Sequence, residues 1–142
     1  MPFDGRTVFV AGGTSGINLG IARAFGAAGA RVAVLSRHAE RVEAAVAQLR
    51  ADGVTALGQA ADVRDAPALE DAFAAVAAEW GPLDVLVSGA AGNFMAPAVT
   101  LSANGFKTVV DIDLLGTFHV LRDNSEENAK RIKYCKWKAV TI

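Results

Sequence analysis

The chain has 142 residues, of which 52% are hydrophobic and 20% charged, and its formal net charge is −1. This length fits one domain, and so large an apolar share excludes a disordered chain. The nearly balanced charge argues against nucleic acid or a membrane as partner, and no apolar run is long enough to span a bilayer. The N-terminus lacks the layout of a signal peptide, and the single Cys135 cannot form an internal disulfide. We therefore expect a soluble, cytoplasmic protein without a metal site.

The first predicted unit is a strand, a glycine-rich turn and a helix, within the segment TVFVAGGTSGINLGIARAF. Ile17, Ile21 and Phe25 recur at helical spacing and are expected on one apolar face. A helix that begins directly after such a turn offers free amide N–H groups and the positive end of its dipole to a phosphate. Glycine allows a pyrophosphate to approach the backbone, although an ordinary glycine-rich turn would have the same pattern. The predicted cofactor-binding residues of this unit are Gly12, Thr14, Ser15, Gly16 and Ile17.

Three further strands alternate with helices along the chain and are expected at residues 31–35, 54–57 and 83–87. Asp65 is expected to cap the helix before the last of these strands, and Ser102 to cap a long helix after it. This long helix carries the large apolar residues Phe106, Val109, Val110, Leu114 and Phe118, and Gly116 and Phe118 after Asp113 suggest that Asp113 is on its buried side. Apolar strands that alternate with helices imply a parallel sheet covered on both faces. The predicted fold class is α/β, a Rossmann-like doubly wound parallel sheet of four to five strands.

The end of the second strand indicates which cofactor is bound. Dinucleotide folds that use NAD commonly place a carboxylate about 20 residues after the glycine turn. Here this place is taken by Ser36 and Arg37. An arginine can pair with a 2′-phosphate through charge-assisted hydrogen bonds and can stack on adenine. The two residues therefore favour NADP(H), although Arg37 could also be a surface arginine at the start of a helix.

Several motifs at their usual intervals resemble the short-chain dehydrogenase/reductase family, and in particular its 2,4-dienoyl-CoA reductase branch of the peroxisomal and bacterial types. They are GGTSGINLGIA, the pair Asp62 and Val63, SGAAGNF, FKTVVDID and GTF. The resemblance implies that Asp62 and Val63 border the adenine ring. It also implies that the small residues Ala90, Ala91 and Gly92 lie against the nicotinamide ribose. Asn18 stands where the family usually has glycine, so it either narrows the pyrophosphate seat or donates a side-chain hydrogen bond.

The resemblance also implies a catalytic role for Asp113, which matches the position of an asparagine in the catalytic network of the family. Asp111 and Asp113 are two residues apart and therefore face different sides of a helix. A carboxylate in the cleft could serve in proton transfer, whereas a solvated helix carboxylate is the alternative. The implied reaction is hydride transfer from NADP(H) to a small-molecule substrate, an enoyl- or dienoyl-CoA thioester.

The composition changes after Arg122. Residues 1–122 contain one lysine and eight arginines, whereas residues 123–142 contain four lysines. We therefore divide the chain into a dinucleotide-binding domain, 1–122, and an atypical tail, 123–142, with a possible last strand at 139–142. Tyr134 and Lys138 have the spacing of the Tyr-x-x-x-Lys pair of the family, but they come too soon after Asp113, and we interpret the spacing as a coincidence.

The family's catalytic serine and Tyr-x-x-x-Lys region have no counterpart in this interpretation, so the chain is expected to be a truncated form of the family fold. An incomplete sheet leaves an open strand edge and uncovered apolar surface, which favours a homo-oligomer. Two functions remain possible: a reductase, or a nucleotide-binding module without turnover.

Overall fold

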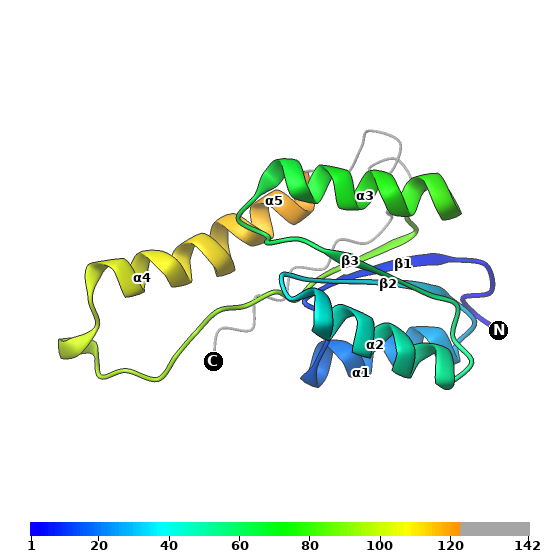
Figure 1. Ribbon diagram of the computed structural model, residues 1–142, viewed down its shortest axis with the longest axis horizontal. Helices are drawn as coiled ribbons and strands as arrows, with labels where there is room; N and C mark the ends of the chain where they lie inside the picture. The colour runs from blue at the N-terminus through cyan, green and yellow to red at the C-terminus, as the bar shows by residue number, and fades with distance from the viewer. Residues whose placement is uncertain (123–142) are drawn as a thin grey trace.

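A computed structural model of the protein describes residues 1–122, which form a four-stranded sheet with helices on both faces (Figure 1). The possible strand at 139–142 and the pair Tyr134 and Lys138 lie outside the described residues. The strands are β1 (Thr7–Ala11), β2 (Arg31–Ser36), β3 (Ala56–Ala60) and β4 (Val85–Ser88). All neighbouring strands are parallel, and their order is β3-β2-β1-β4. This arrangement confirms the predicted Rossmann-like α/β class.

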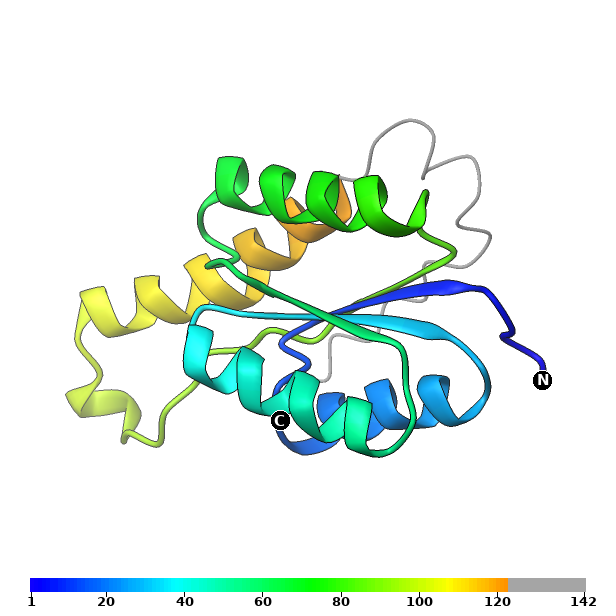
Figure 2. The same ribbon diagram turned by 45° about the vertical axis from the view of Figure 1, so that its right-hand side comes forward.

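The helices between the strands lie in two layers, as the two views in Figures 1 and 2 show. Helices α1 and α2 cover one face of the sheet, and α3 and α5 cover the other. Their bounds are α1 (Gly16–Ala27), α2 (Ala39–Ala51), α3 (Ala66–Trp80), η1 (Ala98–Thr100), α4 (Ala103–Val110), η2 (Asp111–Leu115) and α5 (Gly116–Arg122). Within residues 1–122, no helix combines the length and the apolar composition that crossing a membrane requires.

The central strand β1 separates two apolar cores because its side chains alternate between the faces of the sheet. Val8 and Val10 pack with residues of α1 and α2, whereas Phe9 and Ala11 pack with residues of α3. The ring of Phe9 lies 4.5 Å from that of Phe73, measured between centroids. All of β1 is buried, and this burial on both faces explains why the strand is a continuous apolar run.

The two predicted helix caps are confirmed. The Asp65 carboxylate accepts a hydrogen bond from Ala68 N at 3.1 Å, and Ser102 Oγ accepts one from Gly105 N at 3.0 Å. The predicted strand bounds need small corrections. The third strand begins at Ala56, because Val54 N instead donates to Leu49 O and closes the end of α2. The fourth strand begins at Val85 and extends to Ser88, where it pairs with Ala11.

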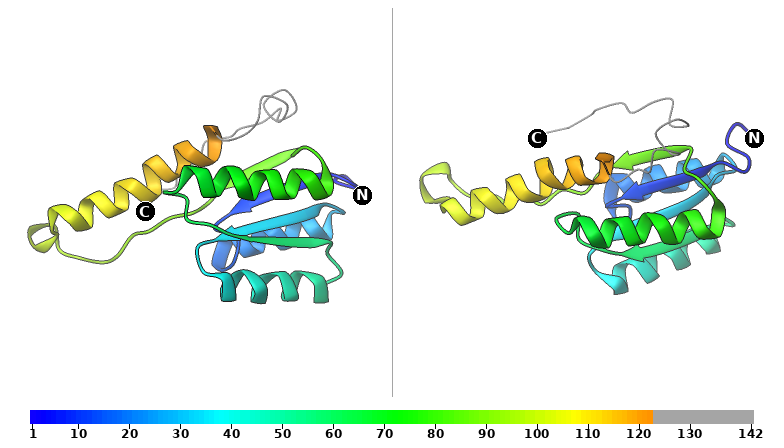
Figure 3. Two further views of the ribbon diagram at one scale, coloured as in Figure 1. Left: turned by 45° about the horizontal axis from the view of Figure 1, so that its top comes forward. Right: turned by 90° about the horizontal axis from the view of Figure 1, so that it is seen from above.

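The large apolar side chains of the long helix after Ser102 are mostly exposed. Phe106, Leu114 and Phe118 are 61%, 60% and 51% exposed, respectively. The helix is divided by one π-helical turn, η2, which inserts a residue and changes the face that meets the sheet. The buried residues are therefore Ile112, Gly116 and Val120. Helix α4 projects beyond the sheet, as Figure 3 shows, and none of its residues is buried.

Ile17 is a second exception to the predicted pattern. It lies in the first turn of α1 and is 83% exposed, so it does not belong to the apolar face of the helix. Ala22 is the residue of α1 that is fully buried. The first turn extends past the end of β1, and a side chain there has no sheet beneath it.

Candidate nucleotide-binding cleft

The carboxyl ends of the four strands open onto one cleft of about 310 Å³. The chain leaves β1 for β2 and β3 and returns to the other side of β1 for β4, so the cleft lies where the strand order reverses. Ligands of open parallel sheets bind at such switch points. The residues that line the cleft are Gly12, Thr14, Ser15, Asn18, Leu35, Ser36, Arg37, His38, Arg41, Ala61, Asp62, Val63, Gly89, Ala90, Ala91 and Ile112.

The glycine turn has the backbone conformation that its sequence requires. Gly12 has a φ of 74°, and a Cβ on it would lie 2.8 Å from Ala90 N, so only glycine fits between β1 and the loop after β4. Gly16, with a φ of 54°, begins α1. Ser15, the N-cap residue, makes no side-chain hydrogen bond to the helix, so it leaves the first amides of α1 to another acceptor. A cradle of this kind fits a pyrophosphate group.

Not all five predicted residues of this turn line the cleft. Gly12, Thr14 and Ser15 do, whereas Gly16 and Ile17 do not. The side chain of Ile17 is exposed and does not line the cleft. Its backbone amide, at the start of α1, is the group that could contact a ligand.

Asn18 connects the start of α1 to the loop after β4. Its Nδ2 donates to Gly89 O at 2.7 Å, so the second of the two roles expected for this asparagine is the observed one. Gly89 allows this contact because a Cβ on it would lie 2.4 Å from Asn18 Oδ1. The polar amide thus holds together the two walls of the cleft.

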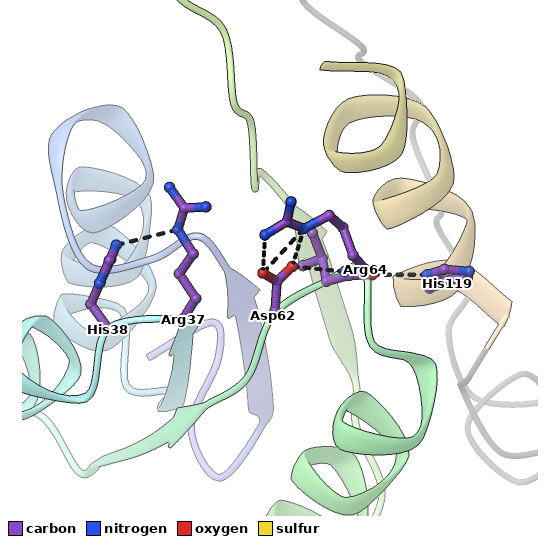
Figure 4. A network of polar contacts seen from close by, with 6 residues as sticks. Arg37, His38, Asp62, Arg64 and His119 are labelled. Carbon is purple, nitrogen blue, oxygen red and sulfur yellow. Dashed lines mark hydrogen bonds and ion pairs between the residues drawn. The ribbon is translucent and has the colours of Figure 1, made fainter. Parts of the chain in front are cut away.

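The end of β2 places an arginine and a histidine on the cleft, and Figure 4 shows these residues, Arg37 and His38, at close range. Arg37 Nε donates to His38 Nε2 at 3.2 Å. Ser36 lines the cleft beside them, and Arg41 reaches it from the first turn of α2. Among residues 1–122, neither Arg37 nor Arg41 forms an ion pair with a carboxylate.

Asp62, at the end of β3, is bound by Arg64 (Figure 4). Arg64 Nε lies 3.0 and 3.1 Å from the two carboxylate oxygens, Arg64 Nη2 lies 2.6 Å from Oδ2, and Arg64 N donates to Oδ1 at 2.9 Å. The Arg64 side chain holds the pKa of the Asp62 carboxyl below its usual range, and the more distant charge of Arg37 acts in the same direction. Asp62 is therefore a fixed, ionised acceptor on the cleft wall.

The backbone next to Asp62 is held by α5. His119 Nδ1 lies 2.8 Å from Val63 O, a contact that is also drawn in Figure 4. Gly116 packs so closely on Val63 that an added Cβ would lie 2.5 Å from Val63 Cγ2. This end of the cleft is therefore supported from the α3 and α5 side of the sheet.

The small-residue loop after β4 meets the π-helical turn. Ala90 and Ala91 line the cleft, whereas Gly92 and Asp113 do not. Instead, Gly92 N donates to Asp113 Oδ1 at 2.8 Å. Asp111 pairs with Lys107, so the two aspartates serve different sides of the helix, as predicted. The observed contact of Asp113 is with the loop backbone.

Sequence reasoning missed part of the cleft wall. Leu35, Ala61 and Ile112 contribute apolar surface, and Arg41 contributes a charge that the helical pattern alone did not single out. A usable signal was that Arg41 lies in the first turn of a helix that begins at the cleft. The contact between Arg64 and Asp62 had no comparable signal in the sequence, because a residue two positions away can point its side chain in many directions.

The parallel sheet of this order, with a glycine turn between β1 and α1, defines the class of the protein as a Rossmann-like α/β domain. The family model for short chain dehydrogenases matches residues 6–132, and the chain belongs to this family. The resemblance to this family that the motifs indicated is therefore confirmed.

Two curated relatives are similar to most of this chain. The peroxisomal 2,4-dienoyl-CoA reductase of Arabidopsis thaliana is 42% identical over 116 residues, which are 82% of this chain and 39% of the relative. The enzyme of the same name from Rattus norvegicus is 46% identical over 118 residues, which are 82% of this chain and 40% of the relative. The chain thus spans about two fifths of the length of these relatives.

Solved structures of the family superpose well on the described residues. The F189W variant of actinorhodin polyketide ketoreductase with NADPH is 36% identical, with a TM-score of 0.83, and the match covers 87% of this chain and 48% of that one. The citronellol catabolism dehydrogenase AtuB of Pseudomonas aeruginosa PAO1 is 35% identical, with a TM-score of 0.80, and the match covers 86% of this chain and 50% of that one.

Proposed function

We propose that the chain is part of an NADP(H)-dependent oxidoreductase that reduces an enoyl- or dienoyl-CoA thioester. One observation carries the cofactor assignment: the end of β2 presents Arg37 to the cleft, where an NAD enzyme would commonly place a carboxylate. The substrate class is supported by the names of the relatives that are similar over most of this chain.

The proposed cofactor contacts follow the cleft from one end to the other. The pyrophosphate is placed on the turn from Gly12 to Ile17, where Thr14 and Ser15 line the cleft. Ser36 and Arg37 are placed at the 2′-phosphate, Asp62 and Val63 at the adenine, and the loop from Ala90 to Gly92 at the nicotinamide ribose. Bound NADP(H) supplies the hydride. The chain supplies orientation, because the strand ends and the glycine turn fix where each part of the cofactor lies.

At the proposed adenine site, Asp62 is already bound by another side chain. Arg64 already donates to both of its oxygens, so an exocyclic amine would share the carboxylate with Arg64 rather than occupy it alone. Three donors of Arg64, namely Nε, Nη2 and the backbone N, already bind this carboxylate, and an ionised carboxylate has about four acceptor positions, which leaves one for an additional donor.

We propose Asp113 as the residue that serves proton transfer, with Gly92 N holding its Oδ1. The same contact supports the second candidate function, a nucleotide-binding module without turnover. Asp113 does not line the cleft, and its hydrogen bond to the loop gives it a structural role that needs no chemistry.

The experiment that separates the two functions measures NADPH binding by fluorescence and NADPH oxidation in the presence of a 2,4-dienoyl-CoA. Binding with substrate-dependent oxidation supports the reductase. Binding without oxidation supports the module, and failure to bind NADPH contradicts both.

We also propose a cytoplasmic homo-oligomer. Large apolar side chains exposed on the loop after β4 and on the helices that follow it support association. Within residues 1–122, these exposed side chains include Phe94, Met95, Val99, Phe106 and Phe118. Light scattering during gel filtration tests the oligomer. Because the relatives are named as peroxisomal enzymes, fractionation of the producing cell tests the compartment.

A further inference from the structure

Arg41 lies on the cleft wall although it belongs to a helix rather than to a strand end. Helix α2 begins at Ala39, so Arg41 is in its first turn, where its N–H donates to His38 O at 3.1 Å. The Cα–Cβ bonds of a helix tilt toward its N-terminus, so a side chain in the first turn reaches back over the helix start. The residue before this start is His38, and the one before that is Arg37. Helix geometry thus brings Arg41 to the same wall as Arg37.

The cleft wall formed by Arg37 and Arg41 carries positive charge that forms no ion pair with a carboxylate of residues 1–122. Within the described part of the chain, Arg6, Arg23 and Arg64 each pair with an aspartate, whereas Arg37 and Arg41 pair with none. Of the residues between 1 and 122 that line the cleft, Asp62 is the only acidic one, and Arg64 donates to both of its oxygens. A concave wall with a net positive charge attracts an anion.

The donors that remain on this wall suit an anion with several oxygens. Arg37 uses its Nε on His38, and its two terminal nitrogens point away from the imidazole in Figure 4. These nitrogens make no hydrogen bond within residues 1–122, and neither does the Arg41 side chain. A phosphate monoester carries about −1.5 to −2 charge at neutral pH and three terminal oxygens. Two guanidinium groups match both its charge and its acceptors.

We propose that Arg41 is a second specificity-determining residue of the cleft, which binds the 2′-phosphate of NADP(H) together with Arg37. This inference rests on the proposed NADP(H) function. The ribose 2′-hydroxyl of NAD(H) carries no charge and gains little from a second arginine. Arg41 therefore acts on the choice between the two cofactors and not on dinucleotide binding in general.

The test measures the affinities of the full 142-residue chain for NADPH and NADH, and for 2′,5′-ADP and 5′-AMP as smaller probes. The variants are Arg37→Gln, Arg41→Gln and Arg41→Lys. Arg23→Gln is the matched control, because it loses the same charge at an exposed pair with Asp52 and does not line the cleft. We expect Arg41→Gln to weaken NADPH and 2′,5′-ADP about tenfold, the loss of one charge-assisted contact, and to leave NADH and 5′-AMP unchanged. Arg41→Lys keeps the positive charge but loses the planar guanidinium group that can donate two parallel hydrogen bonds, so it should retain part of the affinity.

The outcomes separate this inference from the proposed function. If the wild-type chain prefers NADPH and loses the preference in Arg37→Gln but not in Arg41→Gln, the role of Arg41 is wrong and the NADP(H) function stands. A wild-type chain without preference for NADPH contradicts both. An equal loss of NADPH and NADH in Arg41→Gln and Arg41→Lys would mean that Arg41 supports the fold, and it would also overturn the inference.

Discussion

The side-chain amide of Asn18 donates to the carbonyl oxygen of Gly89 at 2.7 Å and so joins two residues that lie 71 positions apart in the chain. One residue belongs to the first turns of α1 and the other to the loop that follows β4. Both line the cleft, and the hydrogen bond sets the distance between its two walls. The asparagine at this position thus replaces a glycine of the family pattern with a crosslink.

Removal of this crosslink should destabilise the fold moderately. In Asn18→Ala the partly buried carbonyl of Gly89 loses its donor, which costs about 1 kcal/mol, and the better helix propensity of alanine offsets part of this cost. Urea unfolding measures the change. Asn104→Ala is the matched control, because Asn104 is an exposed helical asparagine whose side chain makes no hydrogen bond within residues 1–122. A free energy of unfolding in Asn18→Ala as high as in this control would contradict the crosslink.

Two substitutions of Asp113 separate its structural role from the proposed chemical one. Asp113→Asn keeps an oxygen that can accept from Gly92 N, whereas Asp113→Ala removes it. We expect Asp113→Ala to lower the free energy of unfolding by about 1–2 kcal/mol and Asp113→Asn to lower it much less. If Asp113 also transfers a proton, both variants lose NADPH oxidation. An asparagine variant that keeps full activity would remove Asp113 from the chemistry and leave it as a residue that positions the loop.

Arg37→Glu should reverse the charge that the proposed site offers to the 2′-phosphate. We expect the affinity for NADPH to fall at least several-fold, because a carboxylate repels the phosphate, while NADH is affected far less. Fluorescence titration with the two cofactors measures this difference. Equal losses for both cofactors would show that Arg37 does not select NADP(H).

Two glycines of α1 should respond to alanine in opposite directions. A Cβ on Gly20 meets no atom within 4 Å, so Gly20→Ala should stabilise the fold by about 0.5–1 kcal/mol through helix propensity. A Cβ on Gly26 would lie 2.4 Å from Val54 Cγ2, a buried and stiff β-branched side chain, so Gly26→Ala should destabilise by about 1–3 kcal/mol. Thermal unfolding compares the two variants directly. Stabilisation by Gly26→Ala as well as by Gly20→Ala would mean that α1 does not pack on Val54 as described.

The pair formed by Asp62 and Arg64 should make stability depend on pH in the acidic range. Arg64 holds the folded-state pKa of Asp62 below its ordinary value, so the carboxylate stabilises the fold above its unfolded pKa, about 3.9. This contribution is lost as the pH falls through the folded-state pKa. Arg64→Gln should therefore cost at most about 1 kcal/mol at neutral pH, since both side chains are partly exposed, and nothing once Asp62 is protonated.

Urea unfolding of the wild type and of Arg64→Gln at several pH values between neutral and about 3 provides the measurement. The backbone amide of Arg64 still donates to Asp62 Oδ1 in the variant, so part of the pKa shift should remain. If the difference in the free energy of unfolding between the wild type and Arg64→Gln grows toward acidic pH, the stabilisation assigned to this pair is wrong, because it should disappear when Asp62 is protonated.

Local chemistry made much of the fold predictable. The order of strands and helices follows from short-range apolar periodicity, and both caps follow from an oxygen that reaches an amide three residues away. The exposure of Ile17 and the buried face of the helix after Ser102 did not follow from the sequence. Periodicity tells which side of a helix is apolar, but it does not tell where the sheet beneath it ends or where a π-helical turn shifts the register.

The sequence by itself therefore determined the β-α-β order, the need for glycine at Gly12 and the placement of Arg37 at the end of β2, since each depends on neighbouring residues. The tertiary structure alone decided that Asn18 holds Gly89 and that Asp113 holds Gly92. Such contacts join different elements of the fold. Their distances are set by how the helices pack on the sheet, and no local pattern contains that information.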